Sequence, residues 1–190
     1  MNDMKKNITI TLFEMLQEKR LEKITVKDIA DKCNISRQTF YYHFSDIFDI
    51  VKYIFSEATN KALEDYSDID NWETGYVRIM NWTLKNKNLV LNTYNSVRRE
   101  YVEYFMKKVL FEYIIKVVKT EAKNIKVTEE QCDFIANFYT LALNAVSLEW
   151  IRQGMVEKPE VLAKRVNFLI EGDFQKALYK FERENRKGSK

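Results

Sequence analysis

The segment from Thr25 to Phe44 constrains the fold more than any other part of this 190-residue chain. Thr25 is suited to cap a helix, and Asp28 stands three residues later, where a capping-box partner belongs. Asn34 stands where the chain must turn, because asparagine tolerates the left-handed backbone conformation of such turns. An apolar face at helical spacing lies between them, formed by Val26, Ile29, Ala30 and Cys33. The pattern predicts a short helix followed by a tight turn.

The residues after the turn predict a second helix with one buried and one polar side. Ser36 is suited to cap its start, and Phe40 and Phe44, four residues apart, share a core with Ile29 and Ile35. The opposite face carries hydrogen-bonding and aromatic groups without an acid, namely Arg37, Gln38, Thr39, Tyr41, Tyr42 and His43. A helix-turn-helix needs this arrangement, since its second helix offers donors to base edges while the first braces it.

These outward residues predict a contact with double-stranded DNA, although in most proteins a polar helix face is simply a solvated surface. Arg37 and Gln38 carry forked donors that suit guanine and adenine edges, and Tyr42 suits a base or a thymine methyl group. Five residues are expected at phosphates, where they fix register without reading sequence: Thr25, Lys27, Thr39, Tyr41 and His43. Ser36 is a further candidate for DNA binding.

The run Ile-Ala-(x3)-Asn-Ile-Ser-(x2)-Thr-Phe-Tyr-x-His-Phe, which ends at Phe44, closely resembles the TetR-type (AcrR-like) transcriptional regulators. The resemblance covers roughly the first 50 residues. It implies an all-helical homodimer whose N-terminal helix-turn-helix binds a palindromic operator. It also implies a larger C-terminal domain that dimerises and often holds a small effector.

Two positions depart from the pattern of that family. Asn34 stands where its members usually carry Gly, and Ile47 stands where many carry a lysine that meets a phosphate. The resemblance therefore does not provide a phosphate contact at residue 47. The run from Arg37 to Ile50 also resembles a branch that includes proposed dihydroxyacetone kinase regulators.

The charge of the chain argues against purely electrostatic DNA binding. The net charge is +3, and residues 1–50 contain eight Lys or Arg and eight Asp or Glu. Recognition is therefore expected to rest on neutral donors and on a local basic stripe, formed by Lys5, Lys6, Lys27 and Arg37.

Catalytic and metal sites are not expected. His43 is the only histidine and lies on the expected DNA face, so imidazole-based catalysis or metal binding elsewhere is excluded. The sequence also lacks a glycine-rich phosphate loop and a paired-cysteine site. We expect no enzyme activity, no catalytic residue, no metal and no cofactor. A magnesium–tetracycline effector is not expected either, since the tetracycline-binding members of the family use a C-terminal histidine.

The cysteines and the hydropathy of the chain indicate its compartment. Cys33 and Cys132 are isolated thiols without CxxC spacing, which suggests a reducing environment and neither zinc nor a disulfide. No signal peptide and no apolar run of about 18 residues are visible. The expectation is a cytoplasmic protein without a membrane partner.

Composition and apolar spacing predict an all-α fold, and the resemblance to the TetR-type regulators implies two domains. Four Gly and one Pro favour long helices. Residues 1–46 are expected to form the helix-turn-helix DNA-binding domain and residues 47–190 a helical effector-binding and dimerisation domain. A first helix is expected through Ile8, Leu12, Met15 and Leu16, and a long helix near 47–66 precedes a polar break at 67–71. Further helices are expected near 71–85, 89–97, 101–122, 128–153 and 160–182.

The C-terminal aromatic residues allow two interpretations, ordinary core or the walls of an enclosed effector cavity. The first is the commoner outcome for any single residue. The C-terminal aromatic residues taken together favour the cavity. The candidate pocket residues are Trp82, Arg98, Tyr104, Phe105, Tyr113, Phe138 and Tyr139. Arg98 is in this view an anchor for an anionic ligand, and otherwise a solvated corner.

The last two expected helices carry more apolar positions than one internal stripe can bury, which favours a four-helix dimer interface over a wholly internal core. The candidate interface residues are Ala145, Leu148, Phe174 and Leu178. The leading hypothesis is a homodimeric regulator, a repressor released from its operator by an unknown small-molecule effector. The alternative is a transcriptional coactivator or protein-interaction module of the same fold without such an effector.

Overall fold

A computed structural model describes residues 2–64 and 72–188 of the protein. These residues form α-helices and short 3-10 helices, with no β-strand among them, which confirms the predicted all-α fold. Within the same residues, no helix is both long enough and apolar enough to span a bilayer. The chain divides into two compact units, which we call unit 1 (Met1–Lys61 and Asn86–Phe105) and unit 2 (Ala62–Lys85 and Met106–Lys190).

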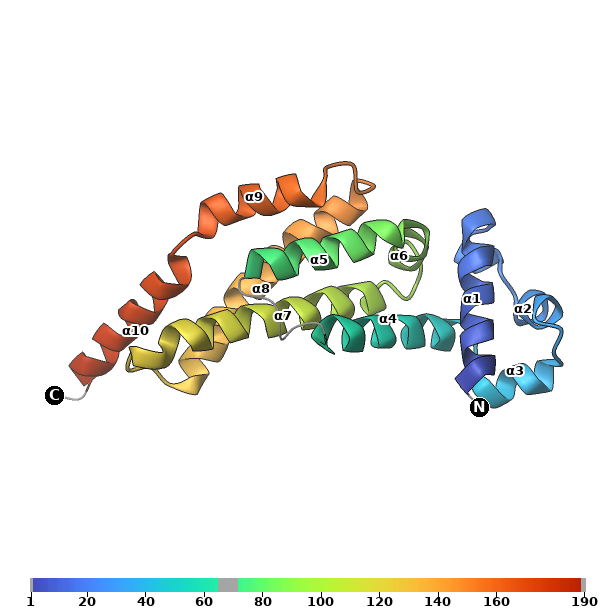
Figure 1. The fold of residues 1–190 in the computed structure, drawn as a ribbon, viewed down its shortest axis with the longest axis horizontal. Coiled ribbons are helices and arrows are strands. Elements are labelled where there is room, and N and C mark those ends of the chain that lie inside the picture. The colour runs from blue at the N-terminus through green and yellow to red at the C-terminus, as the bar shows by residue number, and fades with distance from the viewer. Residues whose placement is uncertain (1, 65–71, 189–190) are drawn as a thin grey trace. The chain divides into compact units, whose positions relative to one another are not determined.

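Unit 1 contains the N-terminal helices and one helix from later in the sequence (Figure 1). Its complete elements are α1 (Asn2–Glu18), η1 (Leu21–Lys23), α2 (Val26–Lys32), α3 (Arg37–His43) and α6 (Lys87–Tyr94). It also includes α4 (Ile47–Glu64) as far as Lys61 and the start of α7 (Glu100–Glu121) as far as Phe105. Helix α1 contacts α2, α3 and α6 and is therefore the central element of the unit.

The first helix forms because its apolar residues recur at three- and four-residue spacing and share one face. Ile8, Leu12, Met15 and Leu16 are all buried, as the sequence predicted. Helix α1 packs on α2 and α3, whose buried residues include Ile29 and Phe40. The helix-turn-helix is thereby held to α1 by a shared hydrophobic core.

Polar contacts join α6 to the end of α1, although more than 60 residues separate them in the sequence. The Leu21 N–H donates to Asn92 Oδ1 at 3.1 Å, and Asn88 Nδ2 donates to Gln17 Oε1 at 2.7 Å. Asn92 is itself oriented by a bond from its Nδ2 to the Asn88 carbonyl at 2.7 Å. Helix α6 is therefore part of the unit that carries the helix-turn-helix. This unit extends beyond the segment 1–46 that was expected to bind DNA.

Unit 2 consists of longer helices, among which α5 packs on α9 and α8 packs on α10 (Figure 1). Its elements are α5 (Trp72–Lys85), the remainder of α7, η3 (Ala122–Asn124), α8 (Glu129–Arg152), α9 (Pro159–Ile170) and α10 (Asp173–Gly188). Helix α8 begins with a capping box: Thr128 Oγ1 accepts the Gln131 N–H at 3.2 Å, and Gln131 Oε1 accepts the Thr128 N–H at 3.0 Å.

The single helix expected over 160–182 is wrong, because the chain forms two helices there. Gly172 adopts a φ of +74°, a left-handed conformation that ends α9 at Ile170 and lets α10 begin at Asp173. The break matters because it changes which face of the following residues points inward. The end of the helix expected near 47–66 and the polar break at 67–71 lie outside the described residues.

The interior of unit 2 contains two hydrogen-bonded tyrosines. Tyr113 is buried, and its hydroxyl donates to the Ala62 carbonyl at 2.9 Å. Tyr76 is fully buried on α5, and its hydroxyl lies 3.1 Å from Ser147 Oγ on α8. Since Ser147 Oγ donates its one hydrogen to the Leu143 carbonyl at 2.8 Å, Tyr76 is the donor to Ser147. Burial raises the pKa of Tyr76 above its ordinary value.

Candidate DNA-binding site

Helix α2 begins with the reciprocal cap that the sequence predicts. Thr25 Oγ1 accepts the Asp28 N–H at 3.1 Å, and Asp28 Oδ2 accepts the Thr25 N–H at 2.9 Å. The Thr25 hydroxyl also donates to Asp28 Oδ2 at 2.8 Å. These bonds, the hydroxyl bond first, hold the pKa of the Asp28 carboxyl below its ordinary value because they stabilise the ionised form. Lys27 is exposed in the same helical turn.

The turn between α2 and α3 closes with the left-handed geometry expected at Asn34, whose φ is +53°. The Asn34 N–H donates to the Asp31 carbonyl at 3.1 Å, and the Ile35 N–H donates to the Ala30 carbonyl at 3.0 Å. These two bonds form a Schellman motif, which satisfies the last carbonyls of α2. Asn34 therefore serves at this position in place of the glycine usual in the family.

Helix α3 is fixed by a cap at its start and by a buried face along its length. Ser36 Oγ accepts the Thr39 N–H at 3.0 Å, as predicted. Phe40 and Phe44 are buried, with 0% and 2% of their surfaces exposed, and their ring centroids lie 6.4 Å apart. This anchoring leaves the opposite face of α3 directed outward.

The outward face of α3 presents the residues that were expected to read bases. Arg37 and Gln38 are exposed, as are Tyr41 (56%) and Tyr42 (73%). No acidic residue occurs on α3, since its sequence is Arg-Gln-Thr-Phe-Tyr-Tyr-His. The face therefore combines one full positive charge with amide and phenol groups, and it carries no negative charge to repel a phosphate.

Thr25, Ser36, Thr39 and His43 are less available to DNA than these four. The hydroxyls of Ser36 and Thr39 lie 2.9 Å apart and bond to each other, and that of Thr25 serves the α2 cap. Thr39 and His43 are half-buried, and the His43 ring packs edge-on against Tyr42 with centroids 5.1 Å apart. Their polar atoms nevertheless lie at the ends of α2 and α3, where phosphate contacts were predicted.

Helix α4 begins with carboxylates rather than with a cation. Asp46 Oδ1 accepts the Asp49 N–H at 2.8 Å, and Asp49 Oδ2 accepts the Ser45 N–H at 3.0 Å. Ile47, the first helical residue, carries no charge. Two acids therefore occupy the positive end of the helix dipole, where an anion would otherwise bind.

Two family models match the chain. One, described as bacterial regulatory proteins of the tetR family, matches residues 11–54, which include α2 and α3. The other, described as the C-terminal region of a transcriptional regulator, matches residues 70–172, more than half of the chain. The chain belongs to the TetR family. It is a DNA-binding transcriptional regulator, and α2 and α3 form the helix-turn-helix of this TetR-family protein.

Two curated relatives have similar sequences. The uncharacterized HTH-type transcriptional regulator YxbF of Bacillus subtilis (strain 168) is 23% identical over 170 residues, which are 84% of this chain and 42% of YxbF. The chain thus spans less than half the length of that relative. The HTH-type dhaKLM operon transcriptional activator DhaS of Lactococcus lactis subsp. lactis (strain IL1403) is 22% identical over 161 residues, 83% of each chain.

Solved structures show the same fold. The dihydroxyacetone kinase operon activator DhaS superimposes with a TM-score of 0.71 at 21% identity, covering 90% of this chain and 96% of that one. Thermus thermophilus FadR, a repressor solved in complex with lauroyl-CoA, gives a TM-score of 0.57 at 14% identity, covering 88% and 94%. The resemblance to the dihydroxyacetone kinase regulators, expected from residues 37–50, is confirmed.

Several residues expected to wall an enclosed effector cavity in this TetR-family regulator do not do so. Tyr104 and Phe138 are 63% and 61% exposed, so they cannot line a closed cavity within the single chain. Arg98 is also exposed; its guanidinium lies 5.4 Å from the Phe48 ring centroid and pairs with Glu100 at 3.5 Å. These positions fail because three- and four-residue spacing identifies a shared face but not the direction in which that face points.

The other pocket candidates are buried or half-buried, and they are divided between the two units. Phe105 is buried in unit 1, where its ring lies 5.6 Å from that of Phe55. Tyr113 is buried in unit 2, and Trp82 and Tyr139 of the same unit are half-buried. The Tyr139 ring packs edge-on against Phe174, with centroids 4.8 Å apart. Phe105 and Tyr139 thus each pack on another aromatic ring of their own unit.

The candidate dimer residues of the TetR-family chain fall into two groups. Ala145 is exposed and Leu148 is half-buried, as an interface requires. Phe174 and Leu178, by contrast, are 4% and 0% exposed and belong to the core of the single chain, so their assignment to the interface is wrong. The exposed large apolar residues of α8 and α9, none of which the sequence analysis named for the interface, are Phe134, Phe138, Leu141, Val146, Val161, Phe168 and Leu169.

Proposed function

We propose that this TetR-family regulator acts as a homodimer on a palindromic operator and represses its target genes until a small-molecule effector releases it. The operator is double-stranded DNA, with its half-sites about 34–36 Å apart, one turn of B-DNA. The observation that carries the proposal is the acid-free outward face of α3, with exposed Arg37 and Gln38. Residues 1–46 are the DNA-binding domain in this proposal, and residues 47–190 bind the effector and dimerise.

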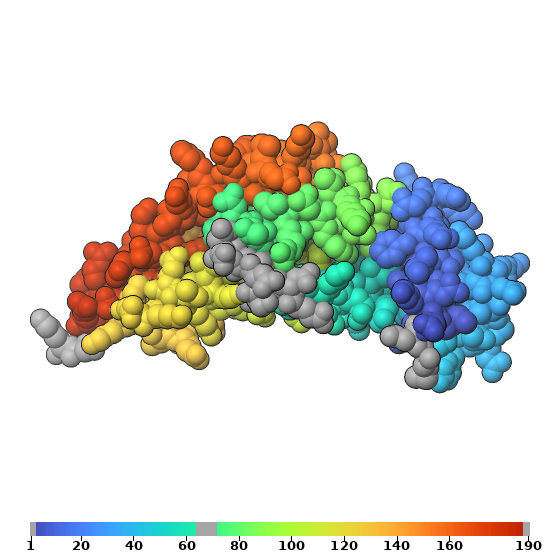
Figure 2. All heavy atoms as spheres, in the orientation of Figure 1, coloured from blue at the N-terminus to red at the C-terminus, as the bar shows by residue number. Residues whose placement is uncertain are grey.

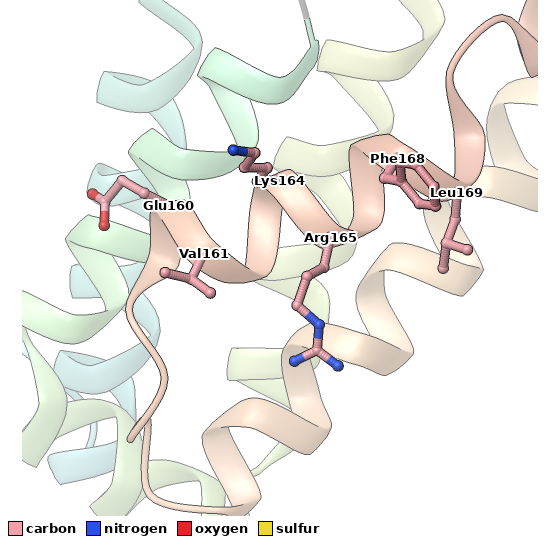
Figure 3. A pocket seen from close by; sticks show the side chains of 6 residues that line it. All are labelled: Glu160, Val161, Lys164, Arg165, Phe168 and Leu169. Carbon is pink, nitrogen blue, oxygen red and sulfur yellow. The ribbon is translucent and has the colours of Figure 1, made fainter.

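Dimerisation is supported by the apolar surface of α8 and α9. Phe168 and Leu169 are 81% and 74% exposed, and Phe138 on α8 is 61% exposed. Groups of this size rarely remain in contact with water unless they bind a partner. The outer side of α9 carries an open hollow of about 690 Å³, and Figure 3 shows that the six residues lining it all come from this helix. In Figure 2 the atoms of α9 (orange) form part of the surface of unit 2.

The effector is placed in unit 2 because that unit contains a polar group in need of a partner. Asn144 Oδ1 on α8 is buried, and no described residue donates a hydrogen bond to it. A hydroxyl or amine of an effector would satisfy this acceptor, which lies one helical turn from the Tyr76–Ser147 pair. Trp82, Tyr113 and Tyr139 of the same unit are the aromatic candidates for its surroundings. FadR, named as a complex with lauroyl-CoA, illustrates that a relative of this fold binds a small molecule.

Release from DNA then follows from a shift between two conformations of the dimer. An effector that prefers the conformation with misplaced α3 helices reduces operator affinity by the ratio of its affinities for the two states. Within unit 1, the bonds from α6 to the end of α1 would pass such a movement to the helix-turn-helix. The long helix α4 offers a second route in the same unit.

The test is a fluorescence-anisotropy titration with the DNA that flanks the gene. Arg37→Ala and Gln38→Ala should each weaken operator binding by about 1–3 kcal/mol and relax base choice at one position, because each removes donors to a base edge. Lys27→Ala should instead weaken binding to all sequences and flatten the salt dependence. If both α3 variants bind like the wild type, the assignment of α3 as the recognition helix is wrong.

A second candidate function is a transcriptional coactivator or protein-interaction module without a small-molecule effector. It is favoured by the exposure of Tyr104 and Phe138, which leaves the expected cavity open at those positions. Thermal unfolding across a metabolite panel distinguishes the two. A ligand that raises the melting temperature and lowers operator affinity supports the effector, whereas no shift with any metabolite supports the coactivator.

A further inference from the structure

Lys5 is held at the edge of the DNA-binding face by two aromatic rings. Its Nζ lies 5.5 Å from the ring centroid of Phe44, the residue that ends α3, and 5.5 Å from that of Tyr53 on α4. The two rings pack edge-on with their centroids 5.7 Å apart. The ammonium group therefore rests against both π-faces, within the distance at which such contacts are attractive.

The charge of Lys5 is not neutralised within the protein. No carboxylate of the described residues pairs with its Nζ, whereas Lys32 is paired with Glu14 at 3.1 Å. Aromatic rings hold a cation without consuming its strong hydrogen-bond donors, so the three N–H groups of Lys5 remain available to an anion. Both the N-terminal end of α1 and the C-terminal end of α3 belong to unit 1 and lie together (Figure 1).

The neighbouring start of α4 lacks a phosphate ligand of its own. Ile47 carries no charge, and the carboxylates of Asp46 and Asp49 cap the first turn, with acceptor distances of 2.8 and 3.0 Å. A phosphate approaching this corner of the site would meet two negative charges. A positive group is needed there if DNA is to lie along the whole of α3.

We propose that Lys5, presented by Phe44 and Tyr53, is the residue that binds a DNA phosphate beside the C-terminal end of α3. The contact fixes register without reading bases, because an ammonium group recognises only the charge of the phosphate. The two rings restrict the lysine chain before DNA arrives, so less conformational entropy is lost on binding. The inference rests on the DNA-binding role of α3 and adds a ligand from α1.

The experiment measures the dissociation constant of operator DNA against KCl concentration for full-length variants. Neutralising one phosphate contact changes the slope of log affinity against log salt by about 0.9. Lys5→Gln should reduce the slope by this amount and weaken binding roughly fourfold at 0.2 M salt, on operator and scrambled DNA alike. Lys180→Gln is the matched control, since it makes the same charge change at an exposed lysine of α10 in unit 2, outside the proposed DNA-binding domain.

The aromatic support is tested separately from the charge. Tyr53→Phe should bind like the wild type because it keeps the ring, whereas Tyr53→Leu should weaken binding and add little to Lys5→Gln in a double-mutant cycle. Far-UV circular dichroism verifies the fold of each variant. If Lys5→Gln and Lys180→Gln have equal slopes while Arg37→Ala loses operator binding, the inference is overturned and the proposed function stands. If Arg37→Ala also binds like the wild type, the proposed function itself fails.

Discussion

At the scale of single residues, the Asp28 carboxylate makes the stability of the helix-turn-helix depend on pH. Its folded-state pKa is lowered by the hydrogen bonds from Thr25, so the ionised form is favoured in the folded protein. A carboxyl with a depressed pKa stabilises the fold above its unfolded pKa. That contribution is lost as the pH falls through the folded value. The start of α2 is therefore expected to loosen under acid conditions, below about pH 4.

We expect Asp28→Asn to lower the melting temperature at pH 7 and to narrow its difference from the wild type as the pH falls from about 4 to 3. The asparagine cannot titrate, so the wild type alone loses the cap in this range. Circular dichroism melts at a series of pH values measure the difference. Asp31→Asn is the control, because Asp31 is an exposed carboxylate of the same helix without a cap bond. A difference that is constant with pH would contradict the assignment.

At the scale of elements, α5 packs closely on the Tyr113 ring of α7 at Gly75. A Cβ at this position would lie 2.6 Å from Cδ2 and 2.9 Å from Cγ of Tyr113, which is closer than carbon atoms can pack. The ring cannot easily move away, since it is buried and its hydroxyl is bonded to Ala62. Glycine is therefore required by packing rather than by backbone conformation.

Gly75→Ala should destabilise the protein by about 1–3 kcal/mol, because the overpacking of Tyr113 outweighs the helix propensity that alanine adds. Urea unfolding measures the change. In a Tyr113→Leu background the same substitution should be neutral or stabilising, since the smaller side chain leaves room for the methyl group. Equal losses in both backgrounds would show that the ring is not the cause.

Most elements were predictable from the sequence, because their caps and apolar spacing are local properties. The capping box at Thr25, the turn at Asn34 and the cap at Ser36 all occur as the sequence indicated. The division of the last helix at Gly172 was missed, because an isolated glycine within an apolar pattern is also compatible with a continuous helix. Lys5 appeared only as part of a basic stripe, since its contact with Phe44 and Tyr53 joins helices α1 and α4 to the C-cap of α3.

Which faces of unit 2 point outward was not predictable, because that depends on the phase of each helix relative to its neighbours. Phe138 and Tyr139 are adjacent in the sequence, yet Phe138 is exposed while Tyr139 packs on Phe174. The break at Gly172 resets the phase of α10, so that Phe174 and Leu178 turn inward. Residues of an interface and residues of a core can therefore recur at the same three- and four-residue spacing in the sequence.

At the scale of the whole molecule, the proposed dimer depends on the exposed residues of α8 and α9. Phe138→Glu or Leu169→Glu should convert a dimer into a folded monomer, because each places a charge in an apolar interface without disturbing the core. Light scattering coupled to size-exclusion chromatography at micromolar concentration should then report half the wild-type mass. Phe174→Glu, at a buried position, should instead unfold the chain. A monomeric wild type would contradict the proposed dimer.

The path of the chain between the two units limits how this regulator can be divided. The sequence passes from one unit to the other after Lys61, Lys85 and Phe105, so neither unit is a continuous stretch of the gene. A fragment that stops at residue 61 retains α1 but loses α6, and with it the acceptor Asn92 and the donor Asn88 at the end of α1. The DNA-reading part is thus interleaved with the remainder of the protein. Recombination at one site cannot exchange it intact, and a chimaera that transplants it must also carry residues 86–105 of this chain.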